Sequence, residues 1–186
     1  MTHNICFLFH DGMEELEAIA PLDLLRRANL KVTTYSLGSQ ITVTSRNGVL
    51  IQADELFEEP LPIDGFYALI IPGGPGVKNL RNDDRVSALI RSFANAGKWI
   101  AAICAAPLLL HDQGLLEGKR YTAHASTADT LSRIDPAASV VIDGNIITSR
   151  GAGTSIDFGL TIVATLTGSE TADSIAKAAE YPYWTP

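Results

Sequence analysis

The stretch that decides the fold is Trp99–Pro107, with the sequence WIAAICAAP. Its first five residues are all apolar, which predicts a strand buried on both faces, as in a parallel sheet between two layers of helices. Small residues follow Cys104 at once, and we expect a helix over 105–111. Cys104 is therefore expected on a sharp strand-to-helix turn. That turn would lie at the carboxyl edge of the sheet, where α/β proteins bind their ligands.

On both sides of this turn, apolar runs alternate with helical patterns, which is typical of an α/β domain with a mainly parallel sheet. The expected elements are strands at 5–9, 31–37, 67–71, 99–103 and 121–122, helices at 13–28, 84–96, 105–111 and 153–167, and hairpins at 41–51 and 140–148. The tail, 180–186, is expected to be irregular. No repeat or linker divides the chain, so we infer one domain over residues 1–186.

The helix at 13–28 has two informative features. Leu16, Ile19, Ala20 and Leu24 fall at helical spacing, which predicts the helix itself. Pro21 cannot donate a hydrogen bond to the carbonyl of Glu17, so a kink or break is expected there.

Composition narrows the class of protein. A chain of 186 residues with 46% hydrophobic residues can form a full core, and its net charge of -7 without a basic cluster argues against nucleic acid as a partner. Two cysteines are too few for a disulfide scaffold, which favours a reducing, cytoplasmic setting. The start, MTHNICFLFHDG, lacks the pattern of a signal peptide, and no run is long enough for a membrane span. The cysteines and histidines lack the spacing of metal ligands.

Cys104 is the candidate reactive group. Helix amides after the turn favour an anion, so we expect them to lower the pKa of this thiol. The alternative is a small buried core residue, as most free cysteines are. Cys6 lies inside its strand, and for it the core interpretation is preferred.

Three other segments carry candidate functional groups. Gly73 and Gly74 follow the strand at 67–71 and would allow backbone N–H groups to approach an oxyanion, or they serve only the turn. Glu17 lies among apolar positions, where a buried carboxyl would have a raised pKa and could donate a proton. His124 is a candidate general base for Cys104, or a structural histidine.

Together these segments resemble the DJ-one/ThiJ/PfpI superfamily over nearly the whole chain, closest to the branch with the Parkinson-associated protein and its bacterial relatives. The matching motifs are Glu14-Glu15-Leu16-Glu17, Pro21-Leu22-Asp23, Arg26-Arg27-Ala28, Pro72-Gly73-Gly74, Ala101-Ala102-Ile103-Cys104-Ala105, His124, Thr148-Ser149-Arg150-Gly151 and Gly153-Thr154-Ser155.

The resemblance implies a flavodoxin-like three-layer sandwich, usually a homodimer, with Cys104 on a nucleophile elbow. It implies that Glu17 hydrogen-bonds this oxidisable cysteine and stabilises its sulfinate, that His124 lies nearby, and that the amides of Gly74 and Ala105 form an oxyanion pocket. Arg46 resembles an arginine that reaches the site across the dimer interface, and Glu14 would support the site from close by.

The sequence departs from the related glutamine amidotransferases, because no acid follows His124 to complete a triad. The implied function is a cofactor-independent, Cys104-dependent glyoxalase or deglycase that acts on α-oxoaldehydes or early glycation adducts. The alternative is a redox-sensing chaperone that uses the same cysteine as a sulfinate. An amidase or peptidase is a weaker alternative.

Overall fold

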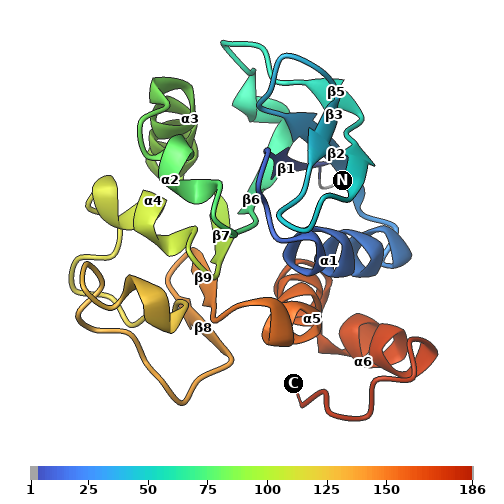
Figure 1. The fold of residues 1–186 in the computed structure, drawn as a ribbon. Helices are drawn as coiled ribbons and strands as arrows, with labels where there is room; N and C mark the ends of the chain where they lie inside the picture. The colour runs from blue at the N-terminus through green and yellow to red at the C-terminus, as the bar shows by residue number, and fades with distance from the viewer. Residues whose placement is uncertain (1–3, 186) are drawn as a thin grey trace.

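The computed structural model of this chain describes residues 4–185. Residues 1–3 of the predicted domain, which include His3, lie outside the described residues. So does Pro186 at the end of the predicted tail. A seven-stranded sheet forms the middle layer, in the order β5-β2-β1-β6-β7-β9-β8 (Figure 1). The strands of this sheet are β1 (Asn4–Phe9), β2 (Lys31–Ser36), β5 (Glu55–Leu56), β6 (Phe66–Ile71), β7 (Trp99–Ile103), β8 (Val140–Asp143) and β9 (Ile146–Ser149).

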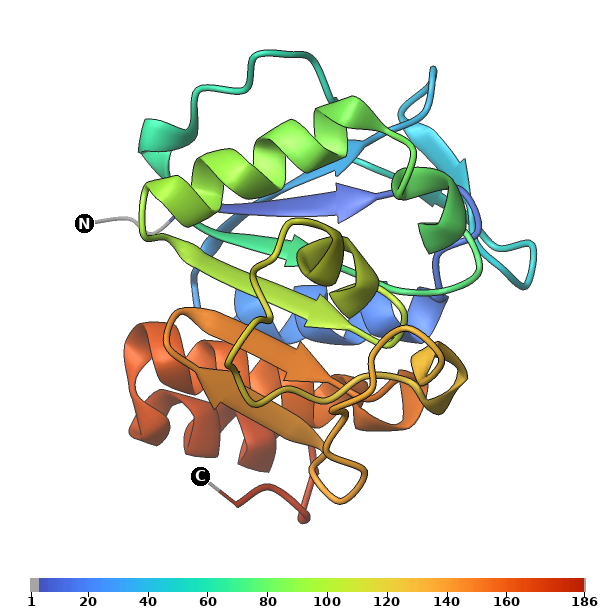
Figure 2. The same ribbon diagram turned by 90° about the vertical axis from the view of Figure 1, so that its left-hand side faces the viewer.

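The sheet is parallel except for β8, which runs antiparallel to β9 (Figure 2). A separate hairpin pairs β3 (Thr42–Thr44) with β4 (Leu50–Gln52). The predicted strands and both hairpins are thus confirmed, apart from residues 121–122. There the chain forms only an isolated bridge between Tyr121 and Ile134.

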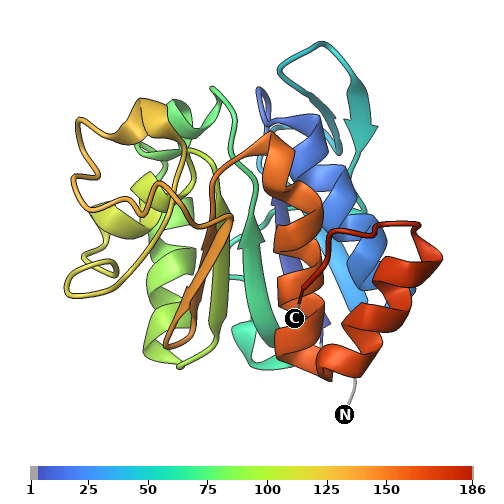
Figure 3. The same cartoon turned by 90° about the horizontal axis from the view of Figure 1, so that it is seen from below.

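Helices cover both faces of the sheet and complete a three-layer sandwich (Figure 3). One face packs on α2 (Val77–Leu80), α3 (Asp84–Asn95) and α4 (Pro107–Asp112), and the other on α1 (Glu15–Arg27), α5 (Ser155–Thr167) and α6 (Ser169–Ala178). Short 3-10 turns occur at η1 (Ile63–Gly65), η2 (Ala125–Thr127) and η3 (Ala152–Thr154). Side chains of β1 alternate between the two cores, with Cys6 and Leu8 in one and Phe7 in the other, as expected of a doubly buried strand.

The apolar positions at helical spacing in α1 divide between core and surface, and Leu24 is among the buried ones. Leu16 and Ile19 are 56% and 41% exposed, whereas Glu17 is 1% exposed. The helix is continuous through Pro21, so the predicted break is wrong. Gly159 of α5 packs closely against Pro21, because a Cβ added to this glycine would lie 2.9 Å from the proline Cα.

Two further elements show where sequence patterns are weak. Helix α6 is not predicted, because its buried residues Ala172, Ile175 and Ala176 are few and mostly small. The helix predicted at 105–111 begins at Pro107, after a turn.

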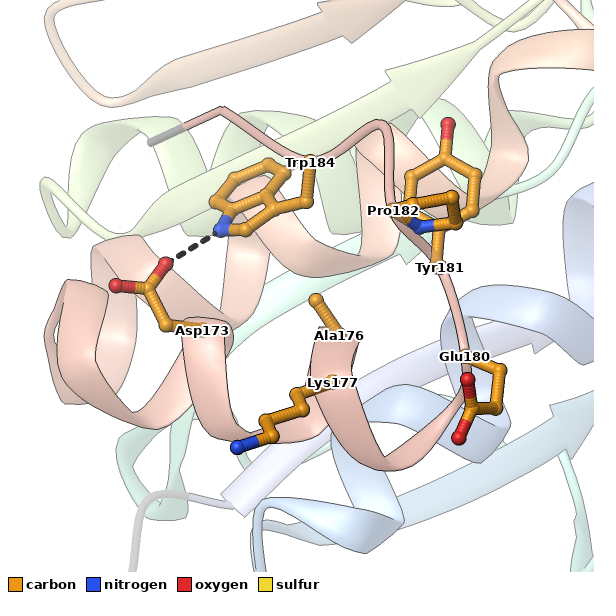
Figure 4. Close-up of a pocket in the computed structure, with 7 residues that line it drawn as sticks. All are labelled: Asp173, Ala176, Lys177, Glu180, Tyr181, Pro182 and Trp184. Atoms are coloured by element: carbon orange, nitrogen blue, oxygen red, sulfur yellow. Dashed lines mark hydrogen bonds between the residues drawn. The ribbon is translucent and has the colours of Figure 1, made fainter.

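The tail after α6 has no regular secondary structure through Thr185, as predicted. It folds back over α6, where Nε1 of Trp184 donates to Oδ1 of Asp173 at 2.8 Å (Figure 4). The tail and α6 enclose a pocket of about 430 Å³. None of the residues that line it is among the predicted site residues.

Candidate active site

Cys104 occupies the turn between β7 and α4 in a left-handed conformation, with φ of +65°. Few residues other than glycine adopt this conformation, and those that do need support from their surroundings. Its N–H donates to the carbonyl of Ser149, and its carbonyl accepts from the N–H of His124, both at 2.9 Å. This arrangement is a nucleophile elbow, which points the Cys104 side chain away from the sheet edge.

Glu17 lies buried beside the elbow. Its Oε2 accepts a hydrogen bond from the N–H of Gly73 at 2.9 Å, and its side chain also hydrogen-bonds Cys104. Burial outweighs these bonds and raises the pKa of Glu17 to about 7. The carboxyl can therefore both accept and donate a proton near neutral pH.

The environment of Cys104 corrects one expectation. Burial, followed by the charge of Glu17, raises the pKa of the Cys104 thiol to about 12. The N–H groups of Gly74 and Ala105 lower this pKa as predicted, but they are outweighed. Because a protonated Glu17 carries no charge and can donate to the sulfur, we infer that a thiolate forms by moving the thiol proton onto Glu17.

The Pro72–Gly76 loop requires its glycines for contact with the elbow. A Cβ on Gly73 would lie 2.6 Å from Cys104 Cβ and 2.7 Å from Glu17 Oε2. Gly74 has φ of +97°, and a Cβ there would lie 2.5 Å from the N atom of Glu14. Glycine at both positions lets the backbone N–H groups approach Glu17 and the sulfur closely.

His124 is exposed and positioned by its own turn. Its Nδ1 accepts from the N–H of Ser126 at 3.2 Å and lies 2.8 Å from the Ser126 hydroxyl. A nitrogen that accepts an N–H bond holds no proton, so the neutral ring carries its proton on Nε2. No carboxylate orients this ring among residues 4–185, so the geometry favours a donor rather than the expected general base.

Arg46 and Glu14 lie behind Glu17. Nη1 of Arg46 is 3.2 Å from Oε2 of Glu14, whose side chain is only 10% exposed. After burial, which dominates, the charge of Glu14 raises the pKa of Glu17 and that of Arg46 lowers it. The charge of Arg46 therefore acts on Glu17 within a single chain, and a contribution across a dimer interface stays a prediction.

A family model described as the DJ-1/PfpI family matches residues 3–165. This chain belongs to the DJ-1/PfpI family. It is 38% identical to Protein DJ-1alpha of Drosophila melanogaster, covering 97% of this chain and 85% of that one. Its fold matches the crystal structure of Drosophila melanogaster DJ-1beta with a TM-score of 0.91 and 36% identity, covering 98% of this chain and all of that one.

Two further DJ-1/PfpI relatives have names that state an activity. The chain is 34% identical to the glutathione-independent glyoxalase DJR-1.2 of Caenorhabditis elegans, covering 90% of each. It is 33% identical to the isonitrile hydratase of Pseudomonas putida, covering 97% of this chain and 79% of the relative. The family thus includes enzymes of different reaction classes.

The structure of this DJ-1/PfpI chain also shows how the predicted site residues converge. Cδ2 of His124, Oε1 of Glu17 and Sγ of Cys104 lie 3.4, 3.7 and 3.9 Å from the point that a Cβ on Gly151 would occupy. Beside this point is a pocket of about 360 Å³ lined by His124, Ala125, Arg150, Gly151, Ala152, Gly153 and Thr154. The contact of the Arg150–Thr154 loop with the Cys104 site could not be predicted, because nothing local to the loop shows that it meets Cys104.

Residues 4–185 offer neither a metal-binding cluster nor a membrane-spanning helix. Within residues 4–185, no three His, Cys, Asp or Glu side chains gather as a set that could hold a metal ion. None of the helices in that range combines the length and apolar character needed to cross a bilayer.

Proposed function

We propose that this chain converts α-oxoaldehydes such as methylglyoxal and glyoxal to 2-hydroxy acids, with Cys104 as nucleophile and no cofactor. The observation that carries the proposal is the hydrogen-bonded pair of Cys104 and a buried Glu17 with a pKa of about 7. A thiol that is otherwise held neutral needs an adjacent base, and a carboxyl that titrates near neutrality serves as one. The glyoxalase name of the DJR-1.2 relative supports the same substrate class.

The first step forms a covalent adduct. Glu17 takes the thiol proton, and the thiolate attacks the aldehyde carbon, so that a C–S bond forms as the C=O π bond breaks. The N–H groups of Gly74 and Ala105 stabilise the resulting oxyanion. Glu17 then returns its proton to this oxygen, which gives a hemithioacetal and a carboxylate ready to act again.

The second step is an internal redox reaction. Glu17 removes the hydrogen of the former aldehyde carbon as a proton, and the electron pair moves to form an enediol with the neighbouring carbonyl. The Nε2–H of His124 is proposed to stabilise the new oxyanion. Glu17 delivers the proton to the neighbouring carbon, and the hydroxyl proton on the sulfur-bearing carbon passes to the oxyanion. The first carbon is thereby oxidised to a thioester while the other is reduced to an alcohol. Water hydrolyses the thioester and restores the thiol, and no external oxidant is needed.

The same chemistry extends to early glycation adducts. An amine or thiol that has added to methylglyoxal presents a hemiaminal or hemithioacetal, which releases the aldehyde to Cys104. The product is again a 2-hydroxy acid, together with the free amine or thiol. We include this deglycase activity in the proposal as a second use of one site.

The test is product identification with purified protein. Methylglyoxal, without thiol or metal, is expected to give lactate detected by proton NMR. An isonitrile and a peptide amide are run in parallel, because the family includes an isonitrile hydratase and amidase chemistry is the weaker alternative. Turnover of either compound with no lactate from methylglyoxal would overturn the proposal. An amidase is disfavoured because the Nδ1 partners of His124 are groups of Ser126 rather than a carboxylate.

Oxidation sensing is a second candidate, and one observation favours it. A Glu17 whose pKa is about 7 is about half protonated at neutral pH and largely protonated below it, so it can donate to a sulfinate on Cys104. The expected sensor would gain two oxygen atoms at Cys104 under mild peroxide. Chaperone activity would be a consequence of that change and would need a separate assay.

We further propose that a second copy of the chain covers the apolar surface formed by Leu16, Ile19, Val49 and Leu50. These side chains are 41–70% exposed, which is costly for four apolar groups. The hairpin adjoins α1, because Asn47 Nδ2 donates to Glu15 Oε1 at 2.7 Å. A homodimer through this surface would place the partner near the back of the Glu14–Arg46 pair.

A further inference from the structure

Arg150 is a cation whose charge the proposed mechanism does not use. Its backbone N–H donates to the carbonyl of Ser139 at 3.3 Å, which fixes the residue at the end of β9. Within the described part of the chain its guanidinium takes part in no hydrogen bond or ion pair, unlike that of Arg46, Arg81 or Arg85. An exposed guanidinium without a carboxylate partner is available to a ligand.

The position of Arg150 relates it to the reactive sulfur. Arg150 lines the pocket of about 360 Å³ together with His124 and the Gly151–Thr154 turn. Gly151 is the next residue. The position that a Cβ on Gly151 would occupy lies within 4 Å of Cys104 Sγ, Glu17 Oε1 and His124 Cδ2. A molecule whose aldehyde reaches Cys104 would therefore extend past Gly151 towards Arg150.

Charge separates the two ends of this path. At the sulfur end, Arg46 offsets the charge of Glu14 through their ion pair, which leaves Glu17 as the charge next to the sulfur. A substrate anion there would be repelled by the ionised Glu17. The pocket lining, in contrast, includes Arg150 and no Asp or Glu. A substrate with an aldehyde at one end and an anion at the other matches this distribution.

We propose that Arg150 is a specificity-determining residue that binds the carboxylate of anionic α-oxoaldehydes, whose aldehyde end reacts at Cys104. This inference rests on the proposed function and narrows its substrate class. The planar guanidinium can donate two parallel hydrogen bonds to a carboxylate, which makes such a pair directional as well as strong. Methylglyoxal, with a methyl group in place of the anion, would then be a minimal substrate.

The experiment compares dioxovalerate, an α-oxoaldehyde that ends in a carboxylate, with its neutral methyl ester. The wild-type kcat/KM is expected to favour the acid roughly 10- to 100-fold, as a charge-assisted hydrogen bond allows. Arg150→Gln should reduce this ratio to about one, mainly by raising KM for the acid, and Arg150→Lys should retain part of it. Added salt should also weaken the preference.

Arg91→Gln is the matched control. Arg91 is exposed on α3 and bonds Gln113, so this change removes the same charge away from the pocket. Its acid-to-ester ratio should equal that of the wild type. An unchanged ratio in Arg150→Gln, or an equal loss in Arg91→Gln, would overturn the assignment.

A binding measurement separates this inference from the proposed function. Levulinate lacks the aldehyde but keeps the carboxylate, and its affinity for the Cys104→Ser protein is measured by NMR titration, with and without Arg150→Gln. If methylglyoxal and the ester are not converted at all, the proposed function fails, and levulinate still tests the anion site. Weaker levulinate binding in the Arg150→Gln protein supports the site, and equal or undetectable binding in both proteins contradicts it.

Discussion

The N–H of Gly73 donates to Oε2 of Glu17 at 2.9 Å, and this bond determines which oxygen of the carboxyl can carry a proton. An oxygen that accepts an N–H bond is the poorer site for its own proton. The proton of Glu17 is therefore expected on Oε1. Oε1 and Cys104 Sγ both lie within 4 Å of the position that a Cβ on Gly151 would occupy. A loop glycine thus directs the acid towards the nucleophile.

The first prediction concerns the pH dependence of kcat/KM for methylglyoxal. Below a pH of about 7, Glu17 is protonated and cannot take the thiol proton, so activity should fall as pH drops through that value. In Glu17→Gln this acid limb should disappear. Activity should instead rise only in the alkaline range, because burial still raises the pKa of Cys104. A pH–rate profile of each protein measures this.

Glu14→Gln is the control for the pH profile. It removes a negative charge that raises the pKa of Glu17 and releases Arg46, whose charge lowers it. The limb should therefore move to lower pH. A shift to higher pH, or an unchanged profile in Glu17→Gln, would show that Glu17 is not the titrating group.

A second prediction concerns the stability cost of a methyl group at Gly73. The added Cβ of Gly73→Ala would lie within 2.7 Å of Cys104 Cβ, Glu17 Oε2 and the Ile103 carbonyl. We expect a loss of about 1–3 kcal/mol in the free energy of unfolding, as for other overpacked sites. Urea unfolding provides the measurement. Gly65→Ala should be close to neutral, because nothing lies within 4 Å of its Cβ point. Equal stabilities of the two variants would contradict this packing.

Fold and site differ in how much the sequence could predict. The strand β7 was predicted with its observed bounds, because a doubly buried strand is one continuous apolar run. Helix α1 and a buried Glu17 were predicted, whereas the exposure of Leu16 and Ile19 was not. Apolar residues at helical spacing indicate a helix, but they do not show which of those residues stay exposed.

The direction of the Cys104 pKa was missed for a related reason. Sequence shows the helix that follows the cysteine, and its amides act in the predicted direction. It does not show how deeply the thiol is buried or that Glu17, distant in sequence, packs beside it. Likewise, nothing local to Arg150 indicates a pocket shared with His124. Such long-range contacts come from the tertiary packing alone.

A third prediction separates the two cysteines by oxidation. Mild peroxide should add two oxygen atoms to Cys104, where Glu17 can donate a hydrogen bond to the sulfinate. Cys6 is fully buried and burial raises the pKa of its thiol, so it should remain unmodified. Peptide mass spectrometry locates the oxygen. Modification of Cys6 before Cys104 would refute this difference.

A fourth prediction tests the apolar surface around Leu50, which is 70% exposed. If a second copy covers it, Leu50→Asp should convert a dimer to a monomer, because a charge would be buried at the interface. Light scattering after size exclusion gives the mass. Ile142→Asp changes another exposed apolar residue, 40% exposed on the edge strand β8, and should remain dimeric. A wild-type monomer, or dimers of both variants, would rule out this interface.

The most direct test of the central claim is the rate of lactate formation from methylglyoxal by the wild-type, Cys104→Ser and Glu17→Gln proteins at neutral pH. The claim is that a thiol and a carboxyl share one proton and carry out the chemistry together. Lactate formation should be abolished in Cys104→Ser and reduced roughly 10²- to 10⁴-fold in Glu17→Gln, the usual contribution of a general acid–base group. Circular dichroism would establish that both variants are folded. Lactate formation by folded Cys104→Ser or Glu17→Gln protein at the wild-type rate would contradict the account.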